Sequence, residues 1–288
     1  MSNILTVSNV CKSYGKNKVL DDVSISVPKG SIYGLIGKNG AGKTTLMRVI
    51  AGLQIPESGS TEHGKNRLGA LINAPAYYGN LSAEENLRAQ FITLGLTSYE
   101  AIPELLKLVK LDHTGRKAVR NFSFGMKQRL GIAIALSGNP DIVLMDEPIN
   151  GLDPQGIIEI REIIIDINRQ KETTFIISSH LLDELSKIAT DYAFIDHGRI
   201  LKEISAKDIT DGSAKSYIAT VTDTSGICTA LDSLGKNYEI ISDTKIRIRD
   251  EITLGQMYEL AQQNGIELTE FTENDTTLEG YYINLVEG

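Results

Sequence analysis

Cysteine is scarce in this sequence of 288 residues. The two cysteines, Cys11 and Cys228, stand far apart and in no spacing typical of metal ligands. This arrangement indicates neither a disulfide framework nor a cysteine-based metal site. We interpret both as reduced thiols of a cytoplasmic protein.

Long apolar runs are also absent. A membrane span needs roughly 18 to 20 apolar residues in succession, and the richest apolar stretch, residues 156–167, is interrupted by charged side chains. That stretch predicts a core helix. The first residues lack the charged start and long apolar segment of a secretory signal, so we expect a soluble protein whose membrane role requires a partner.

Positive charge is in the minority, because 29 Lys and Arg residues face 37 Asp and Glu residues and the formal net charge is −8. This balance argues against a nucleic-acid-binding surface over the whole protein, although it leaves a local basic patch open. The hydrophobic residues, 41% of the chain, suffice for one large domain and a smaller one.

Residues 37–44 carry the clearest motif. They fit the phosphate-binding pattern G-x-x-x-x-G-K-[ST] at every fixed position. The apolar residues 32–36 predict a buried strand before the motif, and residues 45–53 predict a helix after it. A glycine-rich turn before a helix would explain the glycines but not Lys43 and Thr44 directly after them.

The chemistry of this loop follows from its residue types. Gly37, Gly40 and Gly42 can adopt positive φ, so that successive N–H groups turn inward and form a nest for phosphate oxygens. The N-terminus of the following helix adds partial positive charge. Lys43 supplies a full charge to the phosphates, and the Thr44 hydroxyl is a hard oxygen ligand suited to Mg²⁺.

Two adjacent acids end a second predicted strand. Residues 142–145 are apolar, as in a strand buried on both faces of a parallel sheet, and Asp146 and Glu147 follow. At the carboxyl end of such a strand they face the ligand crevice, where Asp146 can hold Mg²⁺ and Glu147 can orient or polarise the attacking water. The alternative is a solvated strand end.

His180 follows a third predicted strand, the β-branched and apolar residues 173–178. From that position it can donate to a phosphate oxygen or hold the water, although a lone histidine is usually structural. Tyr14 lies at a predicted turn between two alternating strands, before the phosphate loop. Its ring can stack on a purine, and the alternative is a half-buried residue at a strand end.

The segment at residues 121–130 distinguishes one family of P-loop ATPases from another. It resembles the signature loop of ABC-type ATPases, usually L-S-G-G-Q, in a divergent form. Ser123 and Gly125 keep a hydroxyl and a close-approaching backbone at a helix N-terminus. The resemblance covers about residues 5–204, with the motifs in the family order. The divergent positions are Phe122, Phe124 and Met126.

The resemblance implies a role for each matching residue, with ATP and Mg²⁺ as cofactors. It identifies residues 37–44 as the Walker A loop and residues 150–153 as the D-loop. The residues implied to contact ATP are Tyr14, Gly37, Lys38, Asn39, Gly40, Ala41, Gly42, Lys43, Thr44, Thr45, Ser123, Gly125 and Met126. Those implied to hold Mg²⁺ are Thr44, Asp146 and Asn73, and those implied in catalysis are Glu147 and the switch histidine His180.

Asn73 departs from the family pattern. It follows a predicted strand, residues 68–72, where the family usually has Gln and where transporters of lantibiotic-like peptides often have Glu. Because Asn is one methylene shorter, its reach toward Mg²⁺ can require a bridging water. Residues 71–78 and 123–129 are similar to ATPase subunits of antimicrobial-peptide export and immunity transporters, which implies export of such a peptide or another amphipathic compound.

The resemblance also implies partners. Two copies stack head to tail, each ATP lies between one Walker A loop and the Ser123 region of the other copy, and an isolated chain hydrolyses ATP slowly. The helical insertion after Asn73 forms a groove for a membrane permease, which places the protein at the inner face of the membrane. The substrate and direction of transport depend on the permease. No nucleic-acid partner is expected.

The predicted fold is an α/β P-loop NTPase of ABC type, with a mixed sheet and an antiparallel N-terminal subdomain. It spans residues 1–210 and contains a helical insertion at about residues 74–140, where Ser82 and Glu85 predict a capping-box helix start. Residues 211–288 are expected to form a small α+β accessory domain with the ferredoxin-like order βαββαβ. Its strands are predicted at residues 216–221, 238–241, 245–249 and 266–271, and its helices at residues 226–234 and 254–263. Residues 276–286 resemble the closing helix of many exporter ATPase subunits.

Two other classes share part of the pattern. A soluble ABC-type ATPase that acts on nucleic acid or ribosomes is disfavoured by the single ATPase unit, the absence of a long coiled-coil insertion between Gly42 and Ser123, and the acidic balance. A P-loop kinase would leave the Ser123 loop and His180 without a function.

Overall fold

The computed structural model describes residues 2–212, 216–274 and 278–287. It divides into two compact units, residues 1–204 and 205–288. The boundary expected from the sequence, between residues 210 and 211, falls inside helix α7 (Ala206–Gly212), which the sequence did not predict. Each unit has its own cluster of buried apolar side chains.

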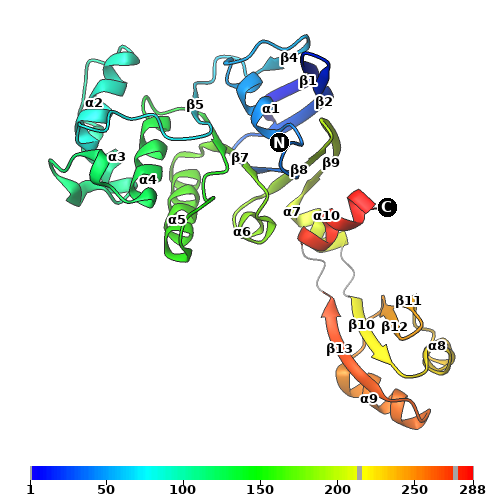
Figure 1. Ribbon diagram of the computed structural model, residues 1–288. Coiled ribbons are helices and arrows are strands. Elements are labelled where there is room, and N and C mark those ends of the chain that lie inside the picture. The colour runs from blue at the N-terminus through cyan, green and yellow to red at the C-terminus, as the bar shows by residue number, and fades with distance from the viewer. Residues whose placement is uncertain (1, 213–215, 275–277, 288) are drawn as a thin grey trace. The chain divides into compact units, whose positions relative to one another are not determined.

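A six-stranded sheet forms the centre of the first unit, in the order β5-β6-β7-β3-β8-β9 (Figure 1). The pairs from β5 to β8 are parallel. The four strands predicted above, β3, β5, β6 and β7, lie within a residue or so of their expected bounds. The bounds of the six strands are Ile32–Ile36 for β3, Leu68–Leu71 for β5, Ile142–Asp146 for β6, Thr174–Ser179 for β7, Asp191–Asp196 for β8 and Arg199–Ser205 for β9.

An antiparallel sheet of order β2-β1-β4 completes the core of this unit. Its strands are β1 (Asn3–Tyr14), β2 (Asn17–Pro28) and β4 (Ser58–Glu62). Helix α1 (Lys43–Ile50) joins one apolar cluster with residues of both sheets. The residues of β4 are polar and mostly exposed, so this strand has no apolar alternation.

The helical insertion lies at the left of Figure 1. It contains α2 (Ala83–Thr93), α3 (Ile102–Leu108) and α4 (Phe124–Ala135), with short 3-10 turns η1 (Asp112–Thr114) and η2 (Val119–Asn121) between the last two. The predicted capping box at Ser82 and Glu85 is confirmed.

Helix α5 (Pro154–Lys171) contains the predicted core helix and buries one apolar face. A short helix, α6 (Leu182–Ser186), follows β7. No helix of the described residues is both long and apolar enough to cross a bilayer.

The second unit has the βαββαβ order that the sequence predicts. Its antiparallel sheet has the order β11-β12-β10-β13. The elements are β10 (Ser216–Val221), α8 (Thr224–Ser233), β11 (Tyr238–Ser242), β12 (Lys245–Ile248), α9 (Leu254–Gln263), β13 (Leu268–Asn274) and α10 (Leu278–Glu287). The predicted closing helix began at residue 276, which with residue 277 lies outside the described residues.

Candidate nucleotide site

The phosphate loop connects β3 to α1 and borders a cavity of about 180 Å³. Gly40 and Gly42 have φ values of 85° and 109°, so the loop uses their conformational freedom as expected. The helix begins at Lys43 and ends at Ile50. The cavity is lined by Val19, Lys38, Asn39, Gly40, Gly42, Lys43, Thr44, Thr45 and Glu147.

Gly37 serves the loop in a different way from the one expected. It is absent from the residues with positive φ. A Cβ at this position would lie 2.3 Å from the carbonyl oxygen of Ile195 and 3.2 Å from the Cβ of Ala41, so close packing excludes a side chain. Neither Gly37 nor Ala41 lines the cavity.

Lys43 turns its ammonium group back onto its own loop. The Nζ donates to the carbonyl oxygens of Gly37 at 2.6 Å and Lys38 at 3.3 Å. It also lies 3.4 Å from Oε1 of Glu147, and the lysine side chain is only 6% exposed. These carbonyls and this carboxylate balance a nearly buried positive charge.

Asp146 and Thr44 meet at the edge where β6 ends and α1 begins. The Thr44 hydroxyl donates to Oδ2 of Asp146 at 2.8 Å. The other oxygen, Oδ1, accepts from the Ser178 hydroxyl at 2.6 Å. The structure thus brings together two of the three residues that the sequence assigned to Mg²⁺.

Glu147 lies between Lys43 and His180. Its Oε2 is 2.8 Å from Nδ1 of His180, at the end of β7. Its Oε1 is buried and accepts no hydrogen bond, although Lys43 lies nearby. A buried carboxylate oxygen without a donor is costly unless a ligand supplies one. The predicted catalytic pair and the phosphate-loop lysine therefore converge from three separate elements.

The third expected metal residue, Asn73, makes no hydrogen bond to this cluster. Asn73 is exposed, and among the described residues its side chain makes no hydrogen bond. Its φ of 67° is a left-handed conformation that Asn adopts more readily than most residues. Asn73 follows the end of β5, where Leu71 pairs with Met145, so it stands at the same sheet edge as Asp146 but does not line the cavity.

Four further expected contacts to ATP lie outside the cavity. The Tyr14 ring is 46% exposed, and its hydroxyl donates to Oε1 of Gln54 at 2.6 Å. Ser123 caps α4, where its hydroxyl accepts the backbone N–H of Met126 at 3.3 Å. Gly125 and Met126 belong to the first turn of the same helix.

Sequence reasoning missed two residues of the site. Val19 lines the cavity from β2, and Ser178 contacts the acidic pair from β7. Neither has a local signal, because each is one member of a strand whose partners are distant in the sequence.

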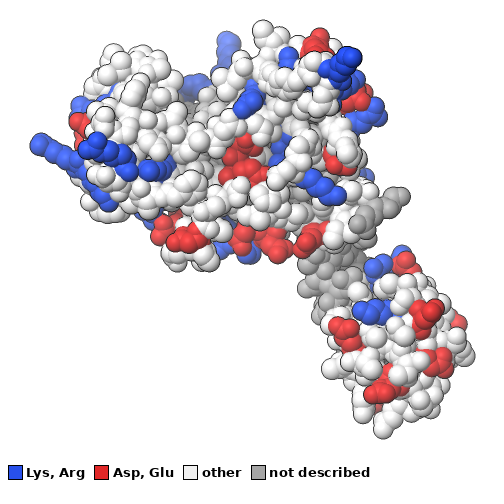
Figure 2. Space-filling model, viewed as in Figure 1, with Lys and Arg blue, Asp and Glu red and all other residues white. Residues whose placement is uncertain are grey.

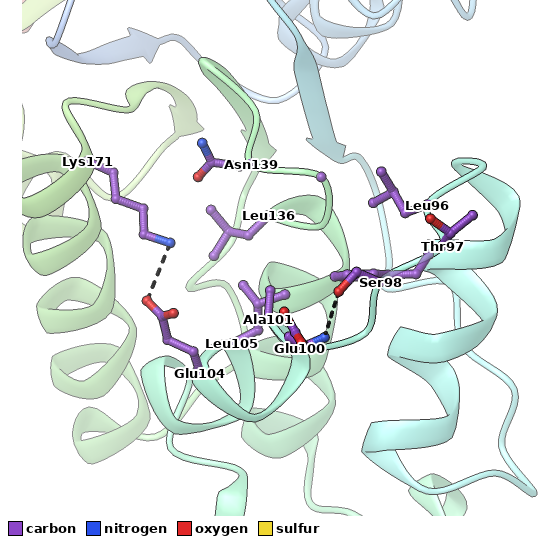
Figure 3. Close-up of a pocket in the computed structure, with 12 residues that line it drawn as sticks. Leu96, Thr97, Ser98, Glu100, Ala101, Glu104, Leu105, Leu136, Asn139 and Lys171 are labelled. Carbon is purple, nitrogen blue, oxygen red and sulfur yellow. Dashed lines mark hydrogen bonds and ion pairs between the residues drawn. The ribbon is translucent and has the colours of Figure 1, made fainter.

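A larger cavity of about 550 Å³ lies in the helical insertion (Figure 3). Leu96, Leu105 and Leu136 supply apolar walls, and Lys171 at the end of α5 lies 3.9 Å from Glu104 of α3. No residue that the sequence assigned to ATP or Mg²⁺ lines it. Volume alone therefore does not identify the nucleotide site.

The insertion also borders a third cavity, of about 380 Å³, whose first lining residue in the chain is Ala76. On the face shown in Figure 2, basic side chains are frequent over the insertion, with acidic ones among them. The cavity is lined by Ala76, Tyr77, Tyr78, Asn86, Ala89, Gln90, Thr93 and Ile134.

Known proteins resemble this chain along its whole length. The model of the ABC transporter family matches residues 20–150. The bacitracin transport ATP-binding protein BcrA of Bacillus licheniformis is 36% identical over 302 aligned positions, covering 100% of this chain and 99% of that protein. The lantibiotic transport ATP-binding protein SrtF of Streptococcus pyogenes is 42% identical over 208 positions, covering 69% of this chain and 90% of that protein.

Solved structures resemble most of this chain. The ADP conformation of MJ1267, an ATP-binding cassette of an ABC transporter, has a TM-score of 0.64 and 26% sequence identity. The match covers 73% of this chain and 95% of that chain. The fold predicted from the motifs is therefore confirmed.

Proposed function

This chain belongs to the ABC transporter family of ATP-hydrolysing subunits, and we propose that it energises a membrane permease that exports an antimicrobial peptide or another amphipathic compound. The observation that carries the proposal is the convergence of Lys43, Glu147 and His180 beside the phosphate loop. Similarity to proteins named for bacitracin and lantibiotic transport supports the substrate class.

The site residues fit ATP with Mg²⁺. The orphaned Oε1 of Glu147 and the ammonium of Lys43, which is folded onto its own loop, are groups that a ligand can engage. Thr44 and Asp146 offer the hard oxygen atoms that Mg²⁺ prefers. When bound, ATP with Mg²⁺ supplies the phosphoryl group to be transferred and the divalent charge that stabilises its transfer.

The protein side of the reaction follows from the contacts of Glu147. Its carboxylate is the group placed to orient and polarise the attacking water. His180 holds this carboxylate through the contact of 2.8 Å between Nδ1 and Oε2. Lys43 binds phosphate oxygens once they replace the carbonyls of Gly37 and Lys38.

A second copy of this chain completes the site in our proposal. Ser123, Gly125 and Met126 lie at the N-terminus of α4 and do not line the cavity of their own chain. A helix N-terminus with a hydroxyl cap is suited to an anion, so these residues are assigned to ATP held by the other copy. An isolated chain should accordingly hydrolyse ATP slowly.

The permease contact is assigned to the third cavity, of about 380 Å³. Tyr77 and Tyr78 on its wall provide large amphipathic surfaces of the kind enriched in interfaces. Docking there places the chain at the inner face of the cell membrane. A soluble ATPase acting on nucleic acid or ribosomes is less well supported, because the relatives reported above are named for transport.

The decisive experiment replaces Glu147 by Gln in the chain co-expressed with its permease. We expect hydrolysis to fall by at least about 100-fold, because general-base assistance is lost while the shape of the side chain is kept. ATP binding, measured by fluorescence titration, should persist. The matched control is Glu162→Gln. Glu162 lies on α5, and its exposed carboxylate pairs with Lys110.

Two results would contradict the proposal. Normal turnover in Glu147→Gln would remove the catalytic role of Glu147. Failure of the chain to co-purify with a permease from solubilised membranes, while it binds ATP normally, would remove the transport role.

A further inference from the structure

Ser178 lies on β7 beside the acidic pair that ends β6. In the parallel pairing of these strands its register partner is Asp146, and its side chain is fully buried. The Ser178 hydroxyl donates to Oδ1 of Asp146 at 2.6 Å. The backbone N–H of Glu147 donates both to that hydroxyl, at 3.0 Å, and to the Ser178 carbonyl oxygen, at 3.1 Å.

The backbone of Glu147 needs such support. Its φ of 50° is in the left-handed region, which residues with a Cβ rarely adopt. This turn brings Glu147 to the cavity that Lys43 and Thr44 also line. The two acceptors on Ser178 hold the N–H of Glu147 and so oppose a return to a commoner conformation.

The same hydroxyl orients Asp146. Because Ser178 engages Oδ1, rotation of the carboxylate is restricted and Oδ2 stays with Thr44, at 2.8 Å. Partners that hold a metal-binding carboxylate in this way set the direction of its free lone pairs.

We propose that Ser178 is a positioning residue of the nucleotide site, whose hydroxyl aims Asp146 at Thr44 and fixes the turn that presents Glu147. It acts through these two acids and does not itself touch the reacting atoms. The inference rests on the proposed function and adds to it a residue that the motifs of the sequence do not include.

Ser179 offers a matched control in the same strand. It is also buried, at 1% exposure, and its hydroxyl accepts the backbone N–H of Leu181 at 2.9 Å. It makes no hydrogen bond to Asp146 or Glu147. Loss of either hydroxyl therefore perturbs the same buried strand, but only loss of the Ser178 hydroxyl removes hydrogen bonds to Asp146 and Glu147.

The experiment compares Ser178→Ala, Ser178→Thr and Ser179→Ala in the full-length chain. The first readout is binding of a fluorescent ATP analogue as a function of Mg²⁺ concentration, with EDTA as the metal-free reference. The second is amide hydrogen exchange of residues 146–149 without nucleotide. Thermal unfolding identifies any variant that fails to fold.

We expect Ser178→Ala to raise by about tenfold the Mg²⁺ concentration at which binding of the ATP analogue is half-maximally enhanced. A tenfold change is the usual scale for losing a hydrogen-bond partner of a metal ligand. Binding in EDTA should be unchanged, and the Glu147 amide should exchange faster. Ser179→Ala should behave as the wild type, and Ser178→Thr, which retains the hydroxyl, should restore both readouts.

Two outcomes would overturn the inference. One is a Ser178→Ala protein that matches Ser179→Ala in both Mg²⁺ dependence and exchange. The other is a folded Ser178→Thr protein with the same defects as the alanine variant. Failure of the proposed function is distinguishable, because it would appear as absent ATP binding in the wild type, whereas the exchange readout needs no nucleotide.

Discussion

At the scale of single residues, the backbone conformation of Asn73 influences which side chain can occupy that position. The sequence assigned Asn73 to Mg²⁺ at a position where the family usually has Gln. The structure shows it exposed, with a φ of 67°. Asn tolerates this conformation better than Gln does, so a shorter side chain and a local turn are compatible at the same position.

We predict that Asn73→Gln preserves or raises ATP hydrolysis, because the longer carboxamide reaches further toward the metal and the water. The substitution should also lower the free energy of unfolding by about 1 kcal/mol, since Gln is less suited to left-handed φ. Steady-state hydrolysis and denaturant unfolding measure the two effects. A folded but inactive variant would mean that the site depends on the shorter side chain.

At the scale of helices and loops, the start of α4 lies close to the loop that precedes α5. The ring of Phe124, which is 55% exposed, lies 3.6 Å from the position that a Cβ on Gly151 would take. Gly125 packs near Leu152 in the same way, at 3.5 Å. Phe124 stands where the usual signature has Gly, so an aromatic ring at the start of α4 lies next to residues 150–153.

We predict that Phe124→Ala loosens residues 150–153 while the fold survives, because the ring is half exposed and lies near the loop on one side. Stability should fall by no more than about 1 kcal/mol. Amide hydrogen exchange of that loop should rise, with Tyr78→Ala, an exposed aromatic in the other part of the insertion, as the control. Unchanged exchange would show that the contact does not restrain the loop.

The start of α2 is a second element whose stability can be tested. The Ser82 hydroxyl accepts the N–H of Glu85 at 3.2 Å, and the Glu85 carboxylate accepts the N–H of Ser82 at 2.7 Å. We predict that Ser82→Ala costs about 1 kcal/mol in the free energy of unfolding, the usual value of an N-cap. Chemical denaturation measures it, and a change near zero would contradict the assignment.

This capping box also predicts a direction of pH dependence. Hydrogen bonds from Ser82, with the backbone N–H the largest cause, lower the pKa of Glu85 below its ordinary value of 4.5. A carboxylate with a lowered pKa in the folded state stabilises the protein above that ordinary value. This contribution is lost as the pH falls through the lowered pKa, and Glu85→Gln should remove it.

At the scale of the whole molecule, the two compact units have separate apolar clusters. Every residue of the candidate site lies between Tyr14 and His180, inside the first unit. We predict that a fragment of residues 1–204 binds ATP within about threefold of the full chain, since each hydrogen bond of the site is internal to it. Fluorescence titration measures this affinity, with Lys43→Ala in the same fragment as the control. An unfolded fragment, or one that binds more than tenfold more weakly, would show that the second unit supports the first.

The order of residues along the chain was enough to predict the loop at residues 37–44, the strands before it and before Asp146, and the capping box at Ser82. These features depend on neighbours in the chain, such as glycine spacing, apolar runs and a Ser followed by Glu at helical distance. For the same reason the sequence alone placed the two acids and His180 at strand ends.

What these residues contact depends on the assembled tertiary fold. Ser178 and Asp146 are 32 positions apart, and their hydrogen bond exists because β6 and β7 pair in one register. A side chain is excluded at Gly37 likewise by a backbone distant in the sequence, that of Ile195 on β8. Side chains that act through partners remote in the chain leave no local pattern, since strand pairing and close packing are set by the complete sheet.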